Sequence, residues 1–340
     1  MSSIDRSYRF IVTGAGFSKA LCPDMPLTSD LDSELFESAG TEQFKNGLAD
    51  YPDLGHLRHR FSDLFEQTGE RIERFGAFLW ESDNFANNKE EALFRSAREE
   101  FISWIAVQVM ERQCLPCNEV TSIIKRFLAH SADNKVRFAT FNYDTIVESV
   151  IESWSNDGVT WNLLPMIDLK TFLGGRRSVD GGRAVIHDIP YLKVHGSTDW
   201  RKLAGSVNAT LESAFRIVAD EPMAVAHHDD PPVLVPMSFA RNATTQGSLF
   251  GATWRAFCGL FAGAAKVDFV GFSFPSTDMR ILMEAAKRRH VVNDIVVLTS
   301  GAVERSKLDS RLKKVFPEAR VYHEGAVEWM REQVETDGPV

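Results

Sequence analysis

The sequence predicts an α/β fold built on a Rossmann-like, mostly parallel sheet that carries a large helical insertion. Short and nearly continuous apolar runs recur along the chain, as in strands that are buried on both faces of a parallel sheet. Helical patterns separate several of these runs, as crossover connections require. The expected strands are Tyr8–Val12, Val136–Thr140, Tyr191–Val194, Val233–Val235, Val267–Val270, Ile295–Leu298 and Arg320–Tyr322.

The interval between the first two strands is expected to be helical. Thr28-Ser29-Asp30 can cap a first helix, and apolar residues then repeat at helical spacing from Leu31 to Ile105. The segment from Val159 to Arg183 is instead expected to be an irregular loop or hairpin. We therefore expect one domain over residues 1–330, with a helical insertion at 28–130, a second, irregular insertion at 155–262, and a tail at 331–340.

Composition narrows the class of protein. The 340 residues include 38 basic and 47 acidic side chains, a net charge of −9 that argues against a broad nucleic-acid surface. No apolar stretch is long enough to span a bilayer, and the N-terminal residues lack the hydrophobic segment of a signal peptide. A cytoplasmic protein that binds neither membranes nor specific nucleic-acid sequences is expected.

The four cysteines predict neither a disulfide framework nor a metal site. Four cysteines are few for a chain of this length. Cys114-Leu-Pro-Cys117 is the one C-x-x-C motif, and a structural zinc site would need two more ligands. The motif follows the helical pattern Glu91–Arg112, so we interpret it as the exit of a helix that ends at Pro116.

The first expected strand ends at Gly14-Ala15-Gly16, and Phe17 to Leu21 can begin a helix. Glycine lets the backbone approach an anion closely, while free N–H groups and the helix dipole supply positive potential. This pattern predicts a phosphate-binding turn. The third glycine of the G-x-G-x-x-G fingerprint is missing, so a plain strand-to-helix turn is the alternative.

Three more polar segments follow expected strands, at the sheet edge where ligands of open α/β sheets bind. They are Phe141-Asn142-Tyr143-Asp144, His195-Gly196-Ser197-Thr198-Asp199-Trp200 and Gly271-Phe272-Ser273-Phe274-Pro275-Ser276-Thr277-Asp278. Each segment has a structural alternative, since Asn142 and Asp144 could cap a helix and His195 could be a buried histidine. Four such strand ends, all able to face one crevice, predict a single ligand site.

The ordered motifs Gly-Ala-Gly-Phe-Ser, Phe-Asn-Tyr-Asp, Leu-Lys-Val-His-Gly-Ser and Val-Gly-Phe-Ser-Phe resemble the sirtuin-like superfamily. The Asn-Tyr-Asp form and the late Gly-Phe-Ser…Asp form resemble the bacterial sirtuin-like NAD hydrolases of antiphage defence. The resemblance spans Val12 to about Leu298, and it implies NAD⁺ as the substrate and no metal.

The resemblance also implies roles for individual residues. Asn142 and His195 correspond to the asparagine and histidine that the family needs at the nicotinamide ribose, and Asp144 to the aspartate associated with the nicotinamide pocket. The residues implied at the pyrophosphate are Gly14, Ala15, Gly16 and Ser18, and those implied at the adenosine half are Gly271 and Ser273. Phe17, Phe272 and Asp278 are also expected to bind the cofactor, and a helix cap is the alternative for Ser273 and Asp278.

The chain departs from the deacylating sirtuins in two places. Their zinc module, two C-x-x-C pairs after the His-Gly motif, is missing, and Cys22-Pro23-Asp24-Met25-Pro26-Leu27 stands where they carry Ile-Pro-Asp-Phe-Arg. Loss of the zinc lobe removes the wall of the acyl-lysine tunnel. The resemblance therefore favours NAD⁺ cleavage over deacylation.

The chemistry needs few groups. Cleavage of the nicotinamide N-glycosidic bond passes through an oxocarbenium-like centre, and the leaving group is already cationic. The site must fix the ribose and position a nucleophile. Asn142 could orient water or a ribose hydroxyl, His195 could accept the released proton, and Asp144 could hold the nicotinamide carboxamide or steer Asn142.

The leading hypothesis is an antiphage effector that hydrolyses NAD⁺ to ADP-ribose and nicotinamide and so depletes the cell of NAD⁺. An NAD-dependent deacylase or ADP-ribosyltransferase, and a catalytically idle NAD- or ADP-ribose-binding scaffold, stay open. Unrestrained hydrolysis would harm the host. Gating by homo-oligomerisation, or by a separately encoded HerA-type ATPase or Argonaute-like protein, is therefore expected.

Overall fold

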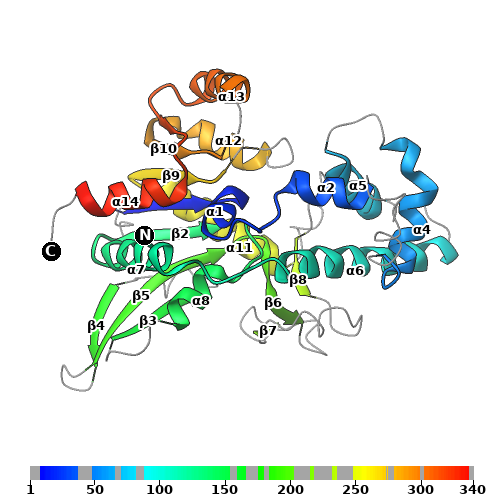
Figure 1. The fold of residues 1–340 in the computed structure, drawn as a ribbon, viewed down its shortest axis with the longest axis horizontal. Coiled ribbons are helices and arrows are strands. Elements are labelled where there is room, and N and C mark those ends of the chain that lie inside the picture. The colour runs from blue at the N-terminus through cyan, green and yellow to red at the C-terminus, as the bar shows by residue number, and fades with distance from the viewer. Residues whose placement is uncertain are drawn as a thin grey trace. The chain divides into compact units, whose positions relative to one another are not determined.

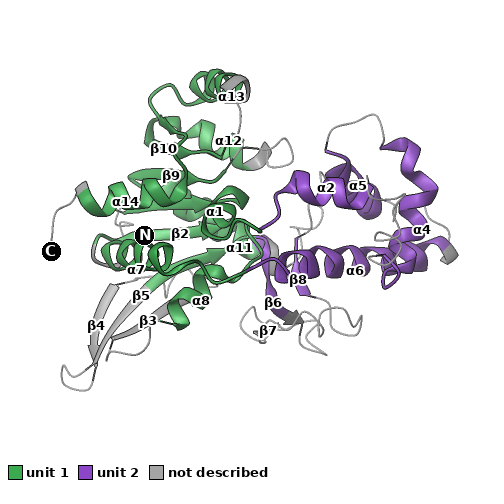
Figure 2. Ribbon diagram, in the orientation of Figure 1, with its two compact units in different colours: residues 1–24, 114–194, 252–340 green, residues 25–113, 195–251 purple. Residues whose placement is uncertain are grey.

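The computed structural model describes residues 8–36, 48–65, 70–81, 88–153, 159–165, 175–179, 184–202, 215–217, 232–235, 248–272, 274, 279–298 and 302–336. The chain divides into two compact units, which Figure 2 shows in different colours. Unit 1 comprises Met1–Asp24, Cys114–Val194 and Ala252–Val340, and unit 2 comprises Met25–Gln113 and His195–Gly251.

Unit 1 holds an eight-stranded sheet with the order β11-β10-β9-β1-β2-β5-β3 (Figure 1), and β4 pairs with β5. The pairings along this order are parallel, while β4 runs antiparallel to β5. A mostly parallel sheet with intervening helices confirms the predicted fold class. The strands are β1 (Arg9–Thr13), β2 (Val136–Thr140), β3 (Val159–Pro165), β4 (Gly175–Val179), β5 (Ala184–Lys193), β9 (Lys266–Val270), β10 (Val292–Val296) and β11 (Arg320–Tyr322).

The strand register brings three of the predicted motifs to one edge of this sheet. Thr13, the last residue of β1, lies opposite Thr140 of β2 on one side and opposite Val270 of β9 on the other. The segments that begin at Gly14, Phe141 and Gly271 therefore leave the sheet at the same level.

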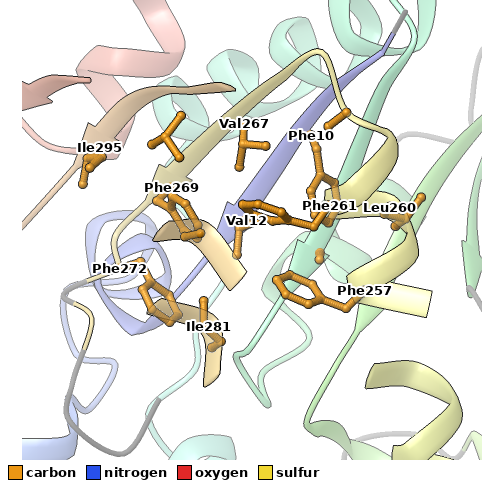
Figure 3. Close-up of a cluster of buried hydrophobic side chains, with 14 of the residues drawn as sticks. Phe10, Val12, Phe257, Leu260, Phe261, Val267, Phe269, Phe272, Ile281 and Ile295 are labelled. Atoms are coloured by element: carbon orange, nitrogen blue, oxygen red, sulfur yellow. The ribbon is translucent and has the colours of Figure 1, made fainter. Parts of the chain in front are cut away.

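Helices cover both faces of the sheet. Alternation along β1 points Phe10 and Val12 to one face, where they join a cluster with Phe257 and Phe261 of α11 (Figure 3). On the other face, the Phe127 ring of α7 lies 5.5 Å from the Trp329 ring of α14. Among the described residues, the helical elements that lie in or extend into this unit are α1 (Ala15–Leu21), α7 (Asn118–Asp133), α8 (Ile146–Glu152), α11 (Ser248–Gly263), α12 (Met279–Lys287), the 3₁₀ turn η7 (Arg289–Val291), α13 (Ala302–Val315) and α14 (Ala326–Thr336).

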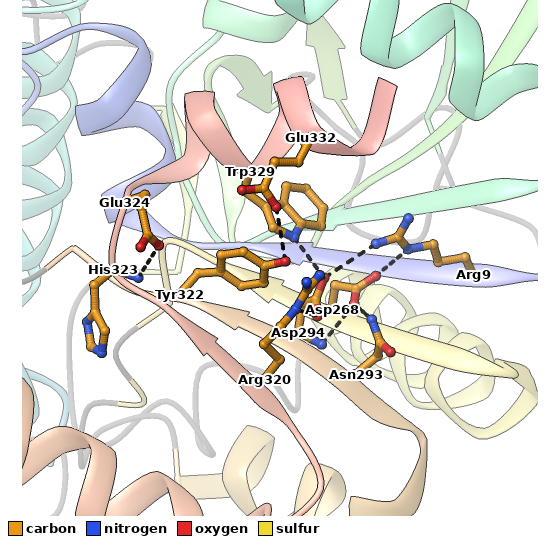
Figure 4. Close-up of polar contacts among 10 residues, drawn as sticks. All are labelled: Arg9, Asp268, Asn293, Asp294, Arg320, Tyr322, His323, Glu324, Trp329 and Glu332. Atoms are coloured by element: carbon orange, nitrogen blue, oxygen red, sulfur yellow. Dashed lines mark hydrogen bonds and ion pairs between the residues drawn. The ribbon is translucent and has the colours of Figure 1, made fainter. Parts of the chain in front are cut away.

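A buried polar network links the strands on the α14 side of the sheet (Figure 4). Asp294 accepts a hydrogen bond from Trp329 Nε1 at 2.9 Å and forms an ion pair with Arg320 at 3.2 Å. Asp268 on the neighbouring strand pairs with Arg9 and accepts from Asn293 Nδ2 at 3.1 Å. Burial raises the pKa of Asp268, although Arg9 opposes that rise. Because each carboxylate has several partners, the pairing order of β1, β9, β10 and β11 is fixed by polar contacts as well as by the core.

Unit 2 contains helices and a small antiparallel sheet. Its helices pack around phenylalanine rings, and the Phe75 ring lies 5.9 Å from that of Phe36 and 5.5 Å from that of Phe65. The helical stretch predicted between the first two strands is thereby confirmed. The elements are α2 (Thr28–Phe36), α4 (Pro52–Phe61), the 3₁₀ turn η2 (Ser62–Leu64), α5 (Arg71–Glu81), α6 (Asn88–Met110), β6 (Gly196–Lys202), β7 (Phe215–Ile217) and β8 (Pro232–Leu234), with β7-β6-β8 as the strand order.

Several local expectations need correction. The run Val233–Val235 is not a strand of the parallel sheet, because β8 pairs antiparallel with β6 in unit 2. The segment expected to be irregular contains β3 and β4, whose pairing with β5 adds them to the large sheet. The helix α7 begins within residues 28–130 and ends at Asp133, and α14 ends at Thr336; the division into one domain with two insertions and a tail stays a prediction.

A disulfide joins Cys22 and Cys114, whose Cα atoms are 6.0 Å apart and which are 92 residues apart in sequence. The sequence did not predict this bond, because the motif that contains Cys114 is interpreted as the exit of a helix. Both cysteines lie in unit 1, on either side of the segment Met25–Gln113 that belongs to unit 2. The bond therefore closes the chain where that segment leaves and rejoins unit 1. Cys117 remains a free, exposed thiol.

Candidate active site

The asparagine that follows β2 is held by the helix that follows β1. Asn142 Nδ2 donates a hydrogen bond to the Gly14 carbonyl oxygen at 2.9 Å and another to the Ser18 hydroxyl at 2.7 Å. A carbonyl oxygen can only accept, so the amide must direct its NH₂ group toward Gly14. Both N–H groups are thus used within the protein. The Asn142 Oδ1 has no hydrogen-bond partner in the described part of the chain, and it is left to accept one from a ligand.

The same network ends on a buried carboxylate. The Ser18 hydroxyl donates to Asp144 Oδ2 at 2.6 Å, and Asp144 Oδ1 accepts the Ile146 N–H at 3.2 Å. Asp144 and Ser18 are both buried. Asp144 therefore connects the start of α8 to Ser18, and through Ser18 it can steer the Asn142 amide.

Gly14 and Gly16 are explained by close packing against the end of β9. The Gly14 N–H donates to the Val270 carbonyl at 3.0 Å, and the Gly16 N–H donates to the Gly271 carbonyl at 2.9 Å. A Cβ atom on Gly14 would lie 2.8 Å from the Gly271 oxygen, and one on Gly16 would lie 3.0 Å from it. The first and last motifs are thus joined backbone to backbone. This reason for the glycines differs from the close approach of an anion that the sequence suggests.

These hydrogen bonds limit what the turn can offer to a phosphate. The N–H groups of Gly14, Gly16 and Phe17 are all donated to backbone carbonyls. The N–H of Ala15, the exposed first residue of α1, has no such partner among the described residues. Of residues 14–17, Ala15 alone could therefore direct its N–H at an anion, and the turn is a narrower anion site than the expected glycine cradle.

Two charged residues that the sequence did not predict, Lys193 and Glu148, contact the segment that carries Asp144. Lys193, the last residue of β5, lies opposite Thr140 of β2 and is buried. Its ammonium donates to the Asp144 carbonyl oxygen at 2.6 Å and pairs with Glu148 Oε1 at 2.6 Å. The signal in the sequence was a lysine inside the apolar run Tyr191–Val194, where a doubly buried strand predicts an apolar side chain.

Tyr191 lies on the same face of β5 as Lys193, because side chains alternate along a strand. Burial raises the pKa of the Tyr191 phenol well above its ordinary value, and the Glu148 and Asp144 carboxylates add to that rise. A hydrogen bond with Thr140 acts in the opposite direction. The phenol therefore stays neutral.

His195 and Gly196 belong to unit 2. The His195 carbonyl accepts the Val235 N–H at 2.8 Å, and the residue is buried. Gly196 has a φ of +85°, and a Cβ there would overlap the Val233 carbonyl. The glycine of the His-Gly pair is thus required by the β6–β8 pairing. His195 follows Val194 directly, whose N–H donates to the Thr140 carbonyl at 2.9 Å.

The residues predicted to bind the adenosine half differ in what they pack against. Gly271 packs against the α1 turn, while the Phe272 ring lies in the core, 5.5 Å from the Phe141 ring. Ser273 and Asp278 lie outside the described residues. The structure therefore brings Gly14, Ser18, Asn142, Asp144 and Gly271 together in one unit.

Among the described residues, no group of three or more His, Cys, Asp or Glu side chains could hold a metal ion. No helix in the described ranges combines the length and apolar character needed to cross a bilayer.

No protein family model matches the sequence, and no curated protein matches it. Solved structures of Sir2 enzymes are similar to the chain. One, from work on the structural basis of their mechanism and regulation, is 11% identical with a TM-score of 0.48, covering 98% of this chain and 97% of that chain. A second, on sirtuin substrate affinity, is 13% identical with a TM-score of 0.42, covering 97% and 94%. Sir2Tm bound to a propionylated peptide is 13% identical with a TM-score of 0.41, covering 97% and 93%. At these values the similarity assigns neither an activity nor a ligand to this chain.

Proposed function

We propose that this chain hydrolyses NAD⁺ to nicotinamide and ADP-ribose. The observation that carries the proposal is the Asn142 side chain, whose orientation is fixed by Gly14 and Ser18 and whose Oδ1 is left as an acceptor. The four ordered motifs, with their resemblance to sirtuin-like NAD hydrolases, supply the substrate class. An amide oxygen held in this way can accept a hydrogen bond from a hydroxyl group, as the positioning of water or of a ribose hydroxyl requires.

The proposed reaction breaks the bond between the ribose C1′ and the nicotinamide nitrogen. The electron pair of that bond returns to the pyridine ring, which leaves as neutral nicotinamide. Water attacks C1′, and its proton passes to the imidazole of His195. Asn142 Oδ1 accepts a hydrogen bond from the water or from a ribose hydroxyl. Fixing these groups in advance is the main source of rate acceleration, because the leaving group needs no protonation.

The rest of the dinucleotide would lie along the edge formed by β1, β2 and β9. The Ala15 N–H is the backbone donor proposed for the pyrophosphate, beside Gly14, Gly16, Phe17 and Ser18. The proposed contacts of the adenosine half are Gly271, Phe272, Ser273 and Asp278. Asp144 is proposed to orient Asn142 through Ser18, since both of its oxygens already accept hydrogen bonds.

The test is NAD⁺ consumption by the purified chain, with nicotinamide and ADP-ribose resolved by chromatography. We expect Asn142→Ala and His195→Ala each to reduce turnover about 10²-fold or more with the fold retained, as is typical when a positioned catalytic group is removed. Asn134→Ala is the matched control. Asn134 is exposed and bonds locally to the His130 carbonyl at 2.9 Å, so its loss should leave turnover unchanged.

Two outcomes would overturn the proposal. One is near-wild-type NAD⁺ cleavage by Asn142→Ala. The other is the absence of cleavage by the wild-type chain under every condition in which calorimetry shows bound NAD⁺. Formation of O-acyl-ADP-ribose from an acyl-lysine peptide would replace hydrolysis with deacylation.

The proposed biological role is that of a cytoplasmic antiphage effector that depletes NAD⁺. It rests on the motif resemblance alone, as do the proposed homo-oligomer and the separately encoded HerA-type ATPase or Argonaute-like activator. Measuring cellular NAD⁺ during phage infection, with wild-type and Asn142→Ala chains expressed beside each candidate activator, tests the role. NAD⁺ loss in both strains would contradict it.

A further inference from the structure

We infer that Lys193 is a positioning residue for the proposed NAD⁺ cleavage, which sets Asn142 in place through the backbone of Asp144. The inference rests on the proposed function. Lys193 itself need touch no substrate, because its ammonium contacts the Asp144 carbonyl and Glu148.

The first step of the argument is the place of Lys193 in the sheet. The β2–β5 register sets Lys193 opposite Thr140, two residues before Asn142. The Thr140 hydroxyl accepts the Asn142 N–H at 3.1 Å. The segment that carries Asn142 therefore leaves the sheet directly beside the lysine.

The second step is that this segment is held from two sides. From α1, Ser18 bonds both the Asn142 amide and the Asp144 carboxylate. From β5, the Lys193 ammonium bonds the Asp144 carbonyl at 2.6 Å. Glu148 in the first turn of α8 pairs with the same ammonium at 2.6 Å, so the lysine also ties α8 to the end of β5. Removing Lys193 would take away the contact from β5 and leave the contacts from α1 in place.

The third step concerns the free energy needed to bury the Lys193 ammonium. A buried ammonium loses its hydration, and an apolar pair of similar volume is often at least as stable as a buried ion pair. An apolar side chain would also match the rest of the run Tyr191–Val194. Stability alone therefore does not account for a charged residue here, whereas fixing the Asp144 carbonyl does.

The test compares Lys193→Met with the double variant Lys193→Met/Glu148→Met. The single variant leaves Glu148 without its ammonium partner, so we expect a lower Tm and lower turnover. The double variant removes both charges, so its Tm should return to near the wild-type value. Its kcat should remain reduced by about tenfold or more, with the KM for NAD⁺ within about twofold of wild type, as expected when a positioned group is lost.

Arg320→Met is the matched control. It removes an ion-pair partner of the buried Asp294 in the same unit, and three strands, β10, β9 and β1, separate β11 from β2. Its Tm should fall while its kcat at a permissive temperature stays at the wild-type value. The positioning role is wrong if the double variant turns over at the wild-type rate. It is also wrong if Arg320→Met and Lys193→Met show the same loss of kcat for the same fall in Tm.

Hydrogen exchange separates this inference from the proposed function. The Ile146 N–H bonds the Asp144 carboxylate, so its protection reports whether the segment is held. We expect faster exchange at Ile146 in the double variant and unchanged exchange in Arg320→Met. If the wild-type chain cleaves no NAD⁺, the proposed function fails, and unchanged Ile146 exchange in the double variant would separately overturn the role of Lys193.

Discussion

Substituting alanine for Gly271 tests whether the glycine turns hold the candidate site together. Gly271 has a φ of +68°, and a Cβ atom there would overlap the Phe17 backbone nitrogen and lie 2.7 Å from the Phe17 Cα. These are backbone atoms of the turn that carries Ser18. They cannot move aside as a flexible side chain would.

The expected loss has two parts. Forcing a non-glycine residue into the left-handed region costs about 1–2 kcal/mol. Overpacking against atoms that cannot yield costs about 1–3 kcal/mol more. We therefore expect Gly271→Ala to lower the free energy of unfolding by about 2–5 kcal/mol, which corresponds to a fall in Tm of at least about 4 °C for a unit of this size.

Two further glycines separate the parts of this effect. Gly325 has a φ of +96°, and the nearest atom to an added Cβ is Glu328 Oε2 at 3.4 Å, so Gly325→Ala should show the backbone cost alone. Gly55 lies inside α4 with its nearest neighbour at 3.8 Å, so Gly55→Ala should be neutral or stabilising by up to about 1 kcal/mol.

The assay is thermal and urea denaturation of the three variants, with unfolding monitored by circular dichroism. The expected order of stability is Gly55→Ala, then Gly325→Ala, then Gly271→Ala. A Gly271→Ala variant as stable as Gly325→Ala would refute the argument, because it would show that the turn after β1 does not pack closely against Gly271.

Two other predictions concern bonds of unit 1. Closing a loop of this length contributes about 4–5 kcal/mol in the chain-entropy model, so the double variant Cys22→Ser/Cys114→Ser should have a lower Tm than wild type, while Cys258→Ser should not. Thiol titration of the unreduced, denatured chain should find two reactive thiols. Four reactive thiols would exclude the disulfide. The raised pKa of Asp268 means that the folded state holds this proton more tightly than the unfolded state does. Its contribution to stability is therefore present below about pH 3.8 and is lost as pH rises through the folded-state pKa. The difference in unfolding free energy between wild type and Asp268→Asn should fall over this window, and a rise would contradict the assignment.

The local pattern of the sequence was sufficient for much of the fold. The apolar runs placed β2 and β11 at their observed bounds and β1 within one residue. The helical spacing between Leu31 and Ile105 corresponds to α2, α4, α5 and α6. These features depend on which face of an element is buried, and burial leaves a period in the sequence that neighbouring residues reveal.

The local pattern could not show which strand, side chain or cysteine each residue contacts in the folded chain. The run Val233–Val235 has the composition of a buried strand, but nothing in it states which sheet it joins. Lys193 interrupts an apolar run, and its purpose became visible only when β5 was set beside β2. Cys22 and Cys114 likewise show no local sign of their bond.

The sequence by itself determined that polar, glycine-marked segments follow the strands of a parallel α/β sheet, because strand ends and turns are written in local residue types. Only the tertiary structure decided what these segments do to one another. Ser18 meets Asp144 across 126 residues, and Gly14 and Gly16 meet Gly271 because strand order and register set β1 between β2 and β9. Strand order arises from the packing of the whole sheet, so the partners of Asn142 could not be read from its neighbours in sequence.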